Sequence, residues 1–243
     1  MYNFLEIEFL KLKRSKIFVL TLLGAIFPSF LLFLSAEFGE ITETLTLKTF
    51  LSQVNMYMSL IFVILLFTII MSYLFGREYN EHTLKTVLTA PTSRGMFIFS
   101  KYAMFLVWIL LITIITSISA IVFGYLAGAI GINMNVVLDS FRELLFTNLL
   151  LFLMFTPLVF MTLIITNMVP AMIGGAILTF TNMIIASSKY SVYFPYSCPY
   201  LIASGEIAQY TTNYTLSYMI ILLTFLVGLT VSYLYFTRKD IPL

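Results

Sequence analysis

The side chains that could take part in acid–base or metal chemistry gather in one short stretch, residues 77–101. In chain order they are Arg77, Glu78, Glu81, His82, Lys85, Arg94 and Lys101. A zinc site requires three or four His, Cys or carboxylate ligands. His82 is the chain's single histidine, and the two glutamates near it lack ligand spacing. The stretch therefore predicts a polar surface to which a protein partner can bind, and it predicts no metal site.

The composition places this stretch in a membrane protein. Of the 243 residues, 60% are hydrophobic and 10% are charged, and the mean hydropathy is +1.02. A soluble domain carries about a quarter charged residues, so this chain cannot cover a water-exposed surface. The net charge of +2 argues against a nucleic-acid partner.

Runs without charge predict the membrane spans, because a charge at the centre of a span costs about 2.5–3.5 kcal/mol. The runs are 17–36, 49–76, 102–138, 144–188 and 207–237. A span needs about 20 residues, so the run 144–188 suits two spans, with Asn167 and Pro170 at the turn. The prediction is an all-α membrane protein with six spans: 17–36, 54–76, 102–125, 145–166, 169–187 and 216–236.

The distribution of basic residues predicts the orientation. With six spans, both ends of the chain and the 77–101 loop share one side, and this side holds ten of the 13 Lys and Arg residues. The positive-inside rule places that side in the cytoplasm. We therefore expect a multi-pass protein with both termini cytoplasmic.

This topology argues against an intramembrane enzyme. A rhomboid-like protease needs a Ser and a His that meet within the membrane, but His82 is predicted to be cytoplasmic and Ser204 to lie outside. Cys198 is the single cysteine, so it forms neither an intrachain disulfide nor a Cys metal cluster. No catalytic residue, metal or bound cofactor is predicted for this chain.

Two further segments have distinctive patterns. Residues 1–16 repeat apolar residues every three or four positions, which predicts an amphipathic helix in the membrane interface. Residues 188–215 combine many tyrosines with two prolines, which predicts a re-entrant outer segment that covers the spans. The candidate lid residues are Tyr193, Pro195, Tyr196 and Tyr200.

Asparagines within the spans and at the turn between two of them are candidates for a substrate path. They are Asn55, Asn167 and Asn182. An amide in lipid must find a hydrogen-bond partner or face a water-filled path. For Asn182, the sequence leaves open an interhelical hydrogen bond and a substrate contact.

The 77–101 loop has features that would let it transmit force to the spans. Thr83 can cap a short helix that ends before Pro91. Leu84, Val87 and Leu88 would form its apolar face, with Lys85 pointing away. Arg94 and Lys101 would then lie at the membrane surface. The alternative is an ordinary connector whose Lys and Arg side chains reach to the interface.

This region resembles the signature of type-2 ABC exporter permeases. The matching positions are the acidic Glu78 after span two, the Thr83-Leu84 step, the pair Val87 and Leu88, Pro91 followed by Arg94, and Lys101 at the start of span three. The family usually has glycine before the threonine, where this chain has His82. The six-span layout resembles the family over almost the whole chain.

The resemblance implies a transport subunit that is not itself an enzyme. Two copies of a separate ABC ATPase would bind ATP and Mg²⁺ and dock on the coupling residues Glu78, Thr83, Leu84, Lys85, Val87, Leu88, Pro91 and Arg94. The chain contains no Gly-x-x-x-x-Gly-Lys-Ser/Thr loop. A second permease, identical or related, would complete the pathway in a bacterial cell membrane.

With its length of 243 residues and its small loops, the chain resembles the small permeases that expel membrane-active amphipathic peptides, such as bacitracin, lantibiotics or peptide toxins. Alternatives are an ABC exporter of another hydrophobic substrate, a drug or a lipid, and a scaffold or sensor that transports nothing. A secondary transporter would use an ionisable residue within a span, and the six predicted spans hold none.

Overall fold

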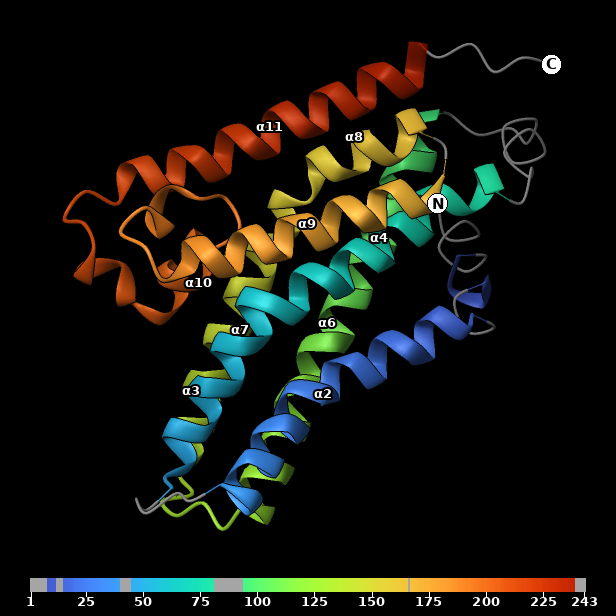
Figure 1. Cartoon of the computed structure of the whole chain (residues 1–243). Coiled ribbons are helices and arrows are strands. Elements are labelled where there is room, and N and C mark those ends of the chain that lie inside the picture. The colour runs from blue at the N-terminus through green and yellow to red at the C-terminus, as the bar shows by residue number, and fades with distance from the viewer. Residues whose placement is uncertain (1–7, 12–14, 40–44, 81–93, 166, 239–243) are drawn as a thin grey trace.

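The computed structural model describes residues 8–11, 15–39, 45–80, 94–165 and 167–238. Their regular elements are helices, which lie side by side in a bundle (Figure 1). In chain order they are α2 (Lys16–Phe38), α3 (Leu47–Tyr57), the π-helical η1 (Met58–Phe62), α4 (Val63–Asn80), α6 (Arg94–Leu126), α7 (Met134–Met154), α8 (Thr156–Ile165), α9 (Met168–Ala186), the 3₁₀ turn η2 (Ser191–Tyr193), α10 (Cys198–Ser204), the 3₁₀ turn η3 (Glu206–Gln209) and α11 (Thr215–Arg238).

Within the described ranges, five helical stretches are long and apolar enough to cross a membrane: Lys16–Phe38, Leu47–Glu78, Gly95–Leu126, Met168–Ala186 and Thr215–Arg238. The bent pair of α7 and α8 forms a sixth candidate, with an angle of 42° between its halves. The predicted fold class, an all-α membrane protein, is confirmed.

The bend between α7 and α8 has a local cause. Pro157 has no N–H to bond the Leu153 carbonyl, and its ring crowds the preceding turn. The Thr156 hydroxyl donates to the Leu153 carbonyl instead, at 3.1 Å. A side chain thus satisfies the group that the proline leaves open, as an apolar environment requires.

The stretch from α3 to α4 is the centre of the bundle. In the most apolar 18 residues of this stretch, 67% are buried, whereas the corresponding share in α2, α9 and α11 is 22% each. α4 packs against α2, α6, α8 and α9. The core around it is aromatic, with Phe67 contacting both Phe105 and Phe155 edge-on at 5.5 Å. The outer helices therefore present apolar faces that can contact lipid or a partner.

Polar side chains join α2 to α6. Trp108 donates to the Thr21 hydroxyl at 3.1 Å, and Thr116 donates to the Ala25 carbonyl at 3.1 Å. One turn further, the hydroxyls of Ser29 and Ser119 lie 3.1 Å apart. Interhelical hydrogen bonds of this kind contribute about 0.6 kcal/mol each in membrane proteins. They fix the register of the two helices more than they add stability.

Three helices begin earlier than the predicted spans 54–76, 102–125 and 145–166. α3 begins at Leu47, α6 at Arg94 and α7 at Met134. The starts of α3 and α7 are set by caps, since Thr46 accepts from the Thr49 amide and Asn133 from the Asn135 amide. A run without charged residues shows only which part of a helix can lie in the hydrocarbon of the membrane. The helices themselves extend beyond these runs and include charged residues.

The segment 191–209 folds over one end of the bundle (Figure 1). It consists of η2, α10 and η3, and it packs on α7 and α11. Val192, Tyr200, Leu201 and Ile207 form a small buried cluster that reaches Met56 and Leu60. This segment lies within the predicted re-entrant region 188–215, and its entry into the outer leaflet stays a prediction.

Glycines let two pairs of helices approach closely. A Cβ on Gly175 of α9 would lie 2.2 Å from Thr68 of α4, and one on Gly228 of α11 would lie 2.6 Å from the backbone nitrogen of Pro157. Small residues at such points allow close helix contact in membranes. The α4–α9 and α8–α11 contacts therefore depend on these positions.

We expect Gly175→Ala to destabilise the folded protein by about 1–3 kcal/mol, the usual cost of overpacking. Thr68 cannot turn away easily, because its hydroxyl donates to the Ile64 carbonyl at 2.7 Å. Gly174→Ala is the matched control, since its Cβ would meet Met161 at an ordinary 3.5 Å. Denaturant unfolding in detergent micelles measures both variants, and equal stability would contradict the close α4–α9 contact.

Candidate functional site

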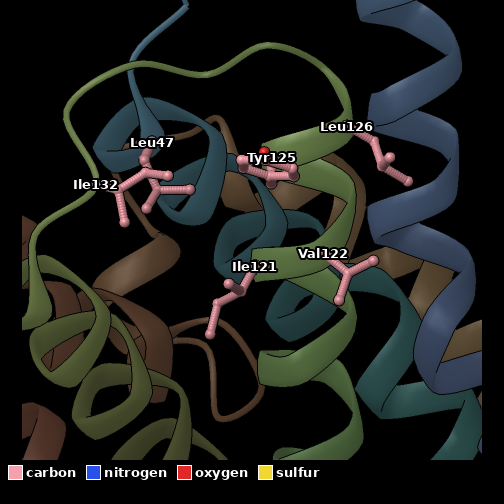
Figure 2. Close-up of a pocket in the computed structure, with 6 residues that line it drawn as sticks. All are labelled: Leu47, Ile121, Val122, Tyr125, Leu126 and Ile132. Carbon is pink, nitrogen blue, oxygen red and sulfur yellow. The ribbon is translucent and has the colours of Figure 1, made fainter.

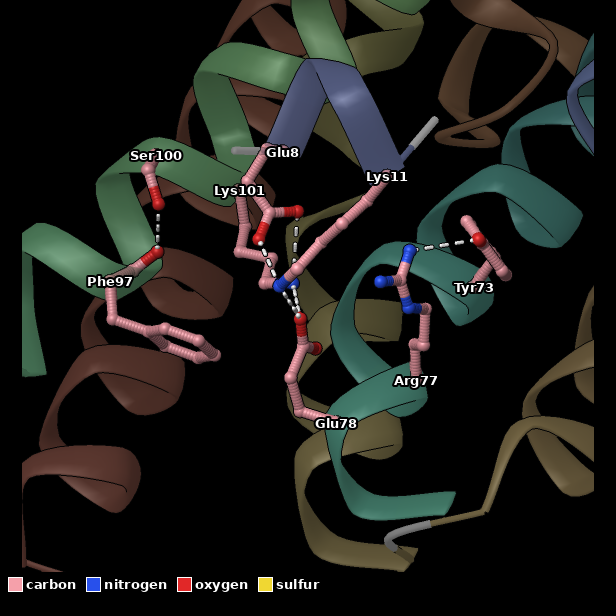
Figure 3. A network of polar contacts seen from close by, with 8 residues as sticks. All are labelled: Glu8, Lys11, Tyr73, Arg77, Glu78, Phe97, Ser100 and Lys101. Carbon is pink, nitrogen blue, oxygen red and sulfur yellow. Dashed lines mark hydrogen bonds and ion pairs between the residues drawn. The ribbon is translucent and has the colours of Figure 1, made fainter. Parts of the chain in front are cut away.

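Four charged side chains meet where α4 ends and α6 begins (Figure 3). They are Glu8, Lys11, Glu78 and Lys101, which we call the charge cluster. Lys101 forms an ion pair with Oε1 of Glu78 and a second one with Oε2 of Glu8, at 3.2 Å. Lys11 lies 3.2 Å from Oε1 of Glu8 and 3.5 Å from Oε1 of Glu78. Three separate segments are thereby joined.

Three of the four side chains in the charge cluster are removed from water. Glu78 and Lys101 are each 1% exposed and Glu8 is 5% exposed. Removing one partner from a buried pair leaves an uncompensated charge and costs about 3–5 kcal/mol. Two carboxylates and two ammonium groups balance in this cluster, so each member depends on the others.

Aromatic rings lie beside two cationic side chains in this region, Lys101 and Arg77. Lys101 Nζ lies 5.1 Å from the centre of the Phe97 ring, one turn earlier on α6. This position is favourable for a cation over a ring face. On α4, the Arg77 guanidinium donates to the Tyr73 hydroxyl at 2.9 Å and lies over that ring. Arg77 thus has a partner on its own helix.

The charges hold Glu8 ionised. Burial alone would raise the pKa of the Glu8 carboxyl. The ammonium groups of Lys101 and Lys11 together outweigh that effect, so its pKa lies below the ordinary value of 4.5. At neutral pH the charge cluster therefore contains an ionised Glu8.

The predicted coupling residues fall largely outside the described part of the chain. These are Thr83, Leu84, Lys85, Val87, Leu88 and Pro91, and His82 lies there too. Arg94 begins α6, but its side chain is not described. Glu78 is described, and it points into the charge cluster, away from water. In this structure, Glu78 connects elements within the subunit.

Two of the predicted path asparagines bond to neighbouring helices. Asn182 is buried and donates to the Leu60 carbonyl at 2.8 Å, within the π-helical η1. Asn55 donates to the backbone and hydroxyl oxygens of Ser140, at 3.0 and 3.1 Å. For Asn182, the interhelical bond that the sequence left open is therefore present. A role in a substrate path stays a prediction.

Asn167, the third predicted path asparagine, lies at the start of a helix and not between helices. It is exposed and caps α9, where its Oδ1 accepts from the Val169 amide at 3.0 Å. It lies at the turn between α8 and α9, next to Met168, which is the residue that a Cβ on Gly76 of α4 would meet. The structure thus does not bring Asn167 together with Asn55 and Asn182.

The candidate lid residues divide into two kinds. Tyr196 and Tyr200 are buried, and the Tyr196 hydroxyl donates to the Met154 carbonyl at 3.2 Å, at the bend between α7 and α8. Tyr193 is exposed and Pro195 is half-buried. Tyr196 therefore ties the 191–209 segment to the broken span.

Two hollows lie at the far end of the bundle. An apolar groove of about 270 Å³ runs between α6 and the start of α3 (Figure 2), lined by Leu47, Ile121, Val122, Tyr125, Leu126 and Ile132. A second hollow, of about 380 Å³, has a mixed lining of Asp139, Arg142, Glu143, Phe146 and Ala203. The groove suits an apolar chain, and the second hollow suits a polar group.

Comparison with known proteins shows the family of the chain. Residues 4–182 match the family described as ABC-2 family transporter protein. The chain belongs to this ABC-2 family. The bacitracin transport permease protein BCRB of Bacillus licheniformis is 35% identical over 191 residues, which make up 78% of this chain and 91% of the relative. The predicted resemblance is confirmed: the chain is a multi-pass permease, the membrane subunit of an ABC transporter.

Sequence reasoning missed two members of the charge cluster in this permease. Glu8 and Lys11 lie in the segment that was predicted to rest in the membrane interface. Their three-residue spacing places them on one helix face, which was an available signal. Their partners lie as many as 93 residues away in the chain, and spacing alone does not reveal such contacts.

We expect acid to weaken the permease through Glu8. Because its folded pKa is lower than its unfolded pKa, Glu8 contributes stability above about pH 4.3–4.5, and this contribution is lost as the pH falls through the folded pKa. The free energy of unfolding in micelles, measured from pH 7 to pH 3, should fall less steeply below pH 4.5 in Glu8→Gln than in the wild type.

Glu37→Gln provides the control for this measurement, because Glu37 is exposed near the other end of α2. It should follow the wild-type pH profile. If Glu8→Gln and the wild type lost stability in parallel, the ion pairs of Glu8 would be contradicted.

Proposed function

We propose that this permease exports membrane-active amphipathic peptides, driven by a separate ABC ATPase. The observation that carries the peptide substrate is the relative whose name gives bacitracin, a peptide, as its cargo, because the similarity covers 91% of that protein. An exporter of a drug or a lipid is the alternative that the test must separate.

The end of the bundle with the charge cluster is proposed to face the cytoplasm. α4 and α11 end there, and α2, α6 and α9 begin there (Figure 1). Of the nine Lys and Arg residues in the described part of the chain, six lie in the segments that meet at this end: Lys11, Lys16, Arg77, Arg94, Lys101 and Arg238. The positive-inside rule expects such an excess on a cytoplasmic side.

The ATPase is proposed to dock on the 81–93 loop between α4 and α6. Both helices that bound this loop are long and pack into the core. A force on the loop therefore acts on rigid elements. We further propose two ATPase copies, which bind ATP and Mg²⁺, and two permease copies, as the family resemblance implies.

The peptide is proposed to travel along the seam of α2, α3–α4 and α9. The outer helices of this seam expose apolar side chains, among them Leu23 and Phe27 on α2 and Ile177 and Phe180 on α9. Such a surface suits a peptide that enters sideways from the lipid.

The test is co-purification with the partner. We expect the tagged permease, expressed with its genomic neighbours and extracted in mild detergent, to retain an ABC ATPase. Leu84→Asp or Leu88→Asp should lose it, because a charge replaces the apolar face of the proposed coupling helix. Leu126→Asp, at the other end of α6 from this loop, is the matched control and should retain it.

The substrate is tested on the same complex in nanodiscs. Bacitracin or a cationic amphipathic peptide should raise the rate of ATP hydrolysis, whereas lipophilic drugs and added lipid should not. Stimulation by drugs or lipids alone would replace the peptide with another hydrophobic substrate. Recovery of no ATPase with the wild type would contradict the exporter and favour a scaffold.

A further inference from the structure

We infer that the bend between α7 and α8 is a hinge, and that the Thr156 hydroxyl stabilises its present angle. On one side of the hinge lies α7, and on the other side α8 and α11 form one unit. A hinge within a span gives the permease a second arrangement of its helices. The inference rests on the proposed function only for the ATP that drives the hinge in the test.

The first half of the bent span is bonded to the body of the bundle. On α7, the Asn148 side chain is fully buried and donates to the Thr113 hydroxyl of α6 at 2.8 Å. Nearer its start, α7 accepts the bonds from the asparagine of α3 described above. An amide that leaves its partner within the membrane interior is costly. α7 therefore stays with α3 and α6.

The second half of the span is bonded to a different neighbour, α11. Gly228 of α11 lies so close to the start of α8 that it has no room for a side chain. The Ser232 hydroxyl donates to the Thr156 carbonyl at 3.3 Å. Further along, the rings of Phe160 and Tyr235 meet edge-on, with their centres 5.6 Å apart. α8 and α11 thus fit each other tightly and should move together.

α8 also packs on α4, and this contact can slide. Its polar part is the Thr162 hydroxyl, which lies 3.3 Å from the sulfur of Met71 and also donates to a carbonyl of its own helix. A methionine side chain is unbranched and adapts to its neighbours. The contact with α4 therefore permits α8 to shift while α7 stays in place.

The carbonyls at the bend are satisfied by side chains. Pro157 removes a backbone donor there. The Met154 carbonyl accepts from the Tyr196 hydroxyl at 3.2 Å, and the Thr156 carbonyl accepts from Ser232. Side-chain hydroxyls rotate and change partners more easily than a helix breaks its backbone bonds. A change in the angle of the bend therefore leaves the backbone bonds on either side intact.

The Thr156 hydroxyl has acceptors on both sides of the hinge. It lies 3.1 Å from the Leu153 carbonyl of α7, and 3.3 and 3.4 Å from the carbonyls of Phe225 and Thr224 of α11. A threonine hydroxyl has one hydrogen to donate, and Thr156 is fully buried, so water does not compete. The hydroxyl bridges α7 and α11 only at the present angle, which it thereby stabilises.

The experiment uses the permease with its ATPase in nanodiscs and spin labels on exposed positions. Leu20→Cys with Ile164→Cys reports the distance from α2 to α8, and Ile164→Cys with Leu234→Cys reports the distance within the α8–α11 unit. α2 serves as the fixed reference, since it is bonded to α6 as α7 is. Native Cys198 is buried and does not take the label.

In the wild type we expect ATP trapped by vanadate to add a second α2–α8 distance, while the α8–α11 distance stays the same. Thr156→Val removes the hydroxyl and keeps the branched shape. Without nucleotide it should raise the ratio of the second distance to the first about fivefold, as the loss of one hydrogen bond implies. Thr147→Val is the matched control, because the Thr147 hydroxyl bonds within α7 at 2.9 Å, and it should match the wild type.

An α2–α8 distance that ignores trapped ATP would overturn the hinge, and a change of equal size between α8 and α11 would overturn the unit. Equal behaviour of Thr156→Val and Thr147→Val would overturn the role of the hydroxyl. If no ATPase were recovered, the proposed function would fail, and these two variants without nucleotide would still decide the inference. Should Thr156→Val fail to fold, Ser232→Ala removes the other hydroxyl that ties α11 to the bend, and an unchanged distance would then overturn the inference.

Discussion

The ion pair between Glu78 and Lys101 is the interaction on which the rest of this structure depends. It closes the gap between α4, the most enclosed span, and α6, which holds α2 through hydrogen bonds. Both side chains are withdrawn from water, where an unpaired charge is costly. Glu8 and Lys11 then extend the pair to the beginning of the described chain. The loop proposed to bind the ATPase is thus bounded by a pair that holds its two ends together.

Outside the charge cluster, the described spans contain few charged side chains, because a charge within a span is costly. The spans are built from apolar side chains, with hydroxyls and amides that satisfy backbone groups at the points where proline or the π-helical turn disturbs the helix. Thr156 does so beside Pro157, and Asn182 does so at Leu60. Apart from the charge cluster, polar groups in the described spans thus act mainly as structural partners.

An all-α protein with several membrane-spanning helices could be predicted from the sequence, because lipid strongly penalises charge. The bounds of the individual spans stay predictions. The family could be predicted from the motif between Glu78 and Lys101. The helices α3, α6 and α7 extend beyond the predicted spans, because a helix continues through charged residues such as Asp139 once it has left the hydrocarbon. The burial of Glu78 was missed, since its pairing with Lys101 and Glu8 depends on how three segments pack and leaves no local pattern in the chain.

In the folded permease, Glu8 and Lys101 stabilise each other through their ion pair. The most direct measurement is a double-mutant cycle on the free energy of unfolding in micelles, with Glu8→Gln, Lys101→Met and the double variant. The account predicts that the double variant loses less stability than the sum of the single variants, with a coupling of about 0.5–3 kcal/mol. Additive losses would show that the two side chains act independently and would contradict the charge cluster.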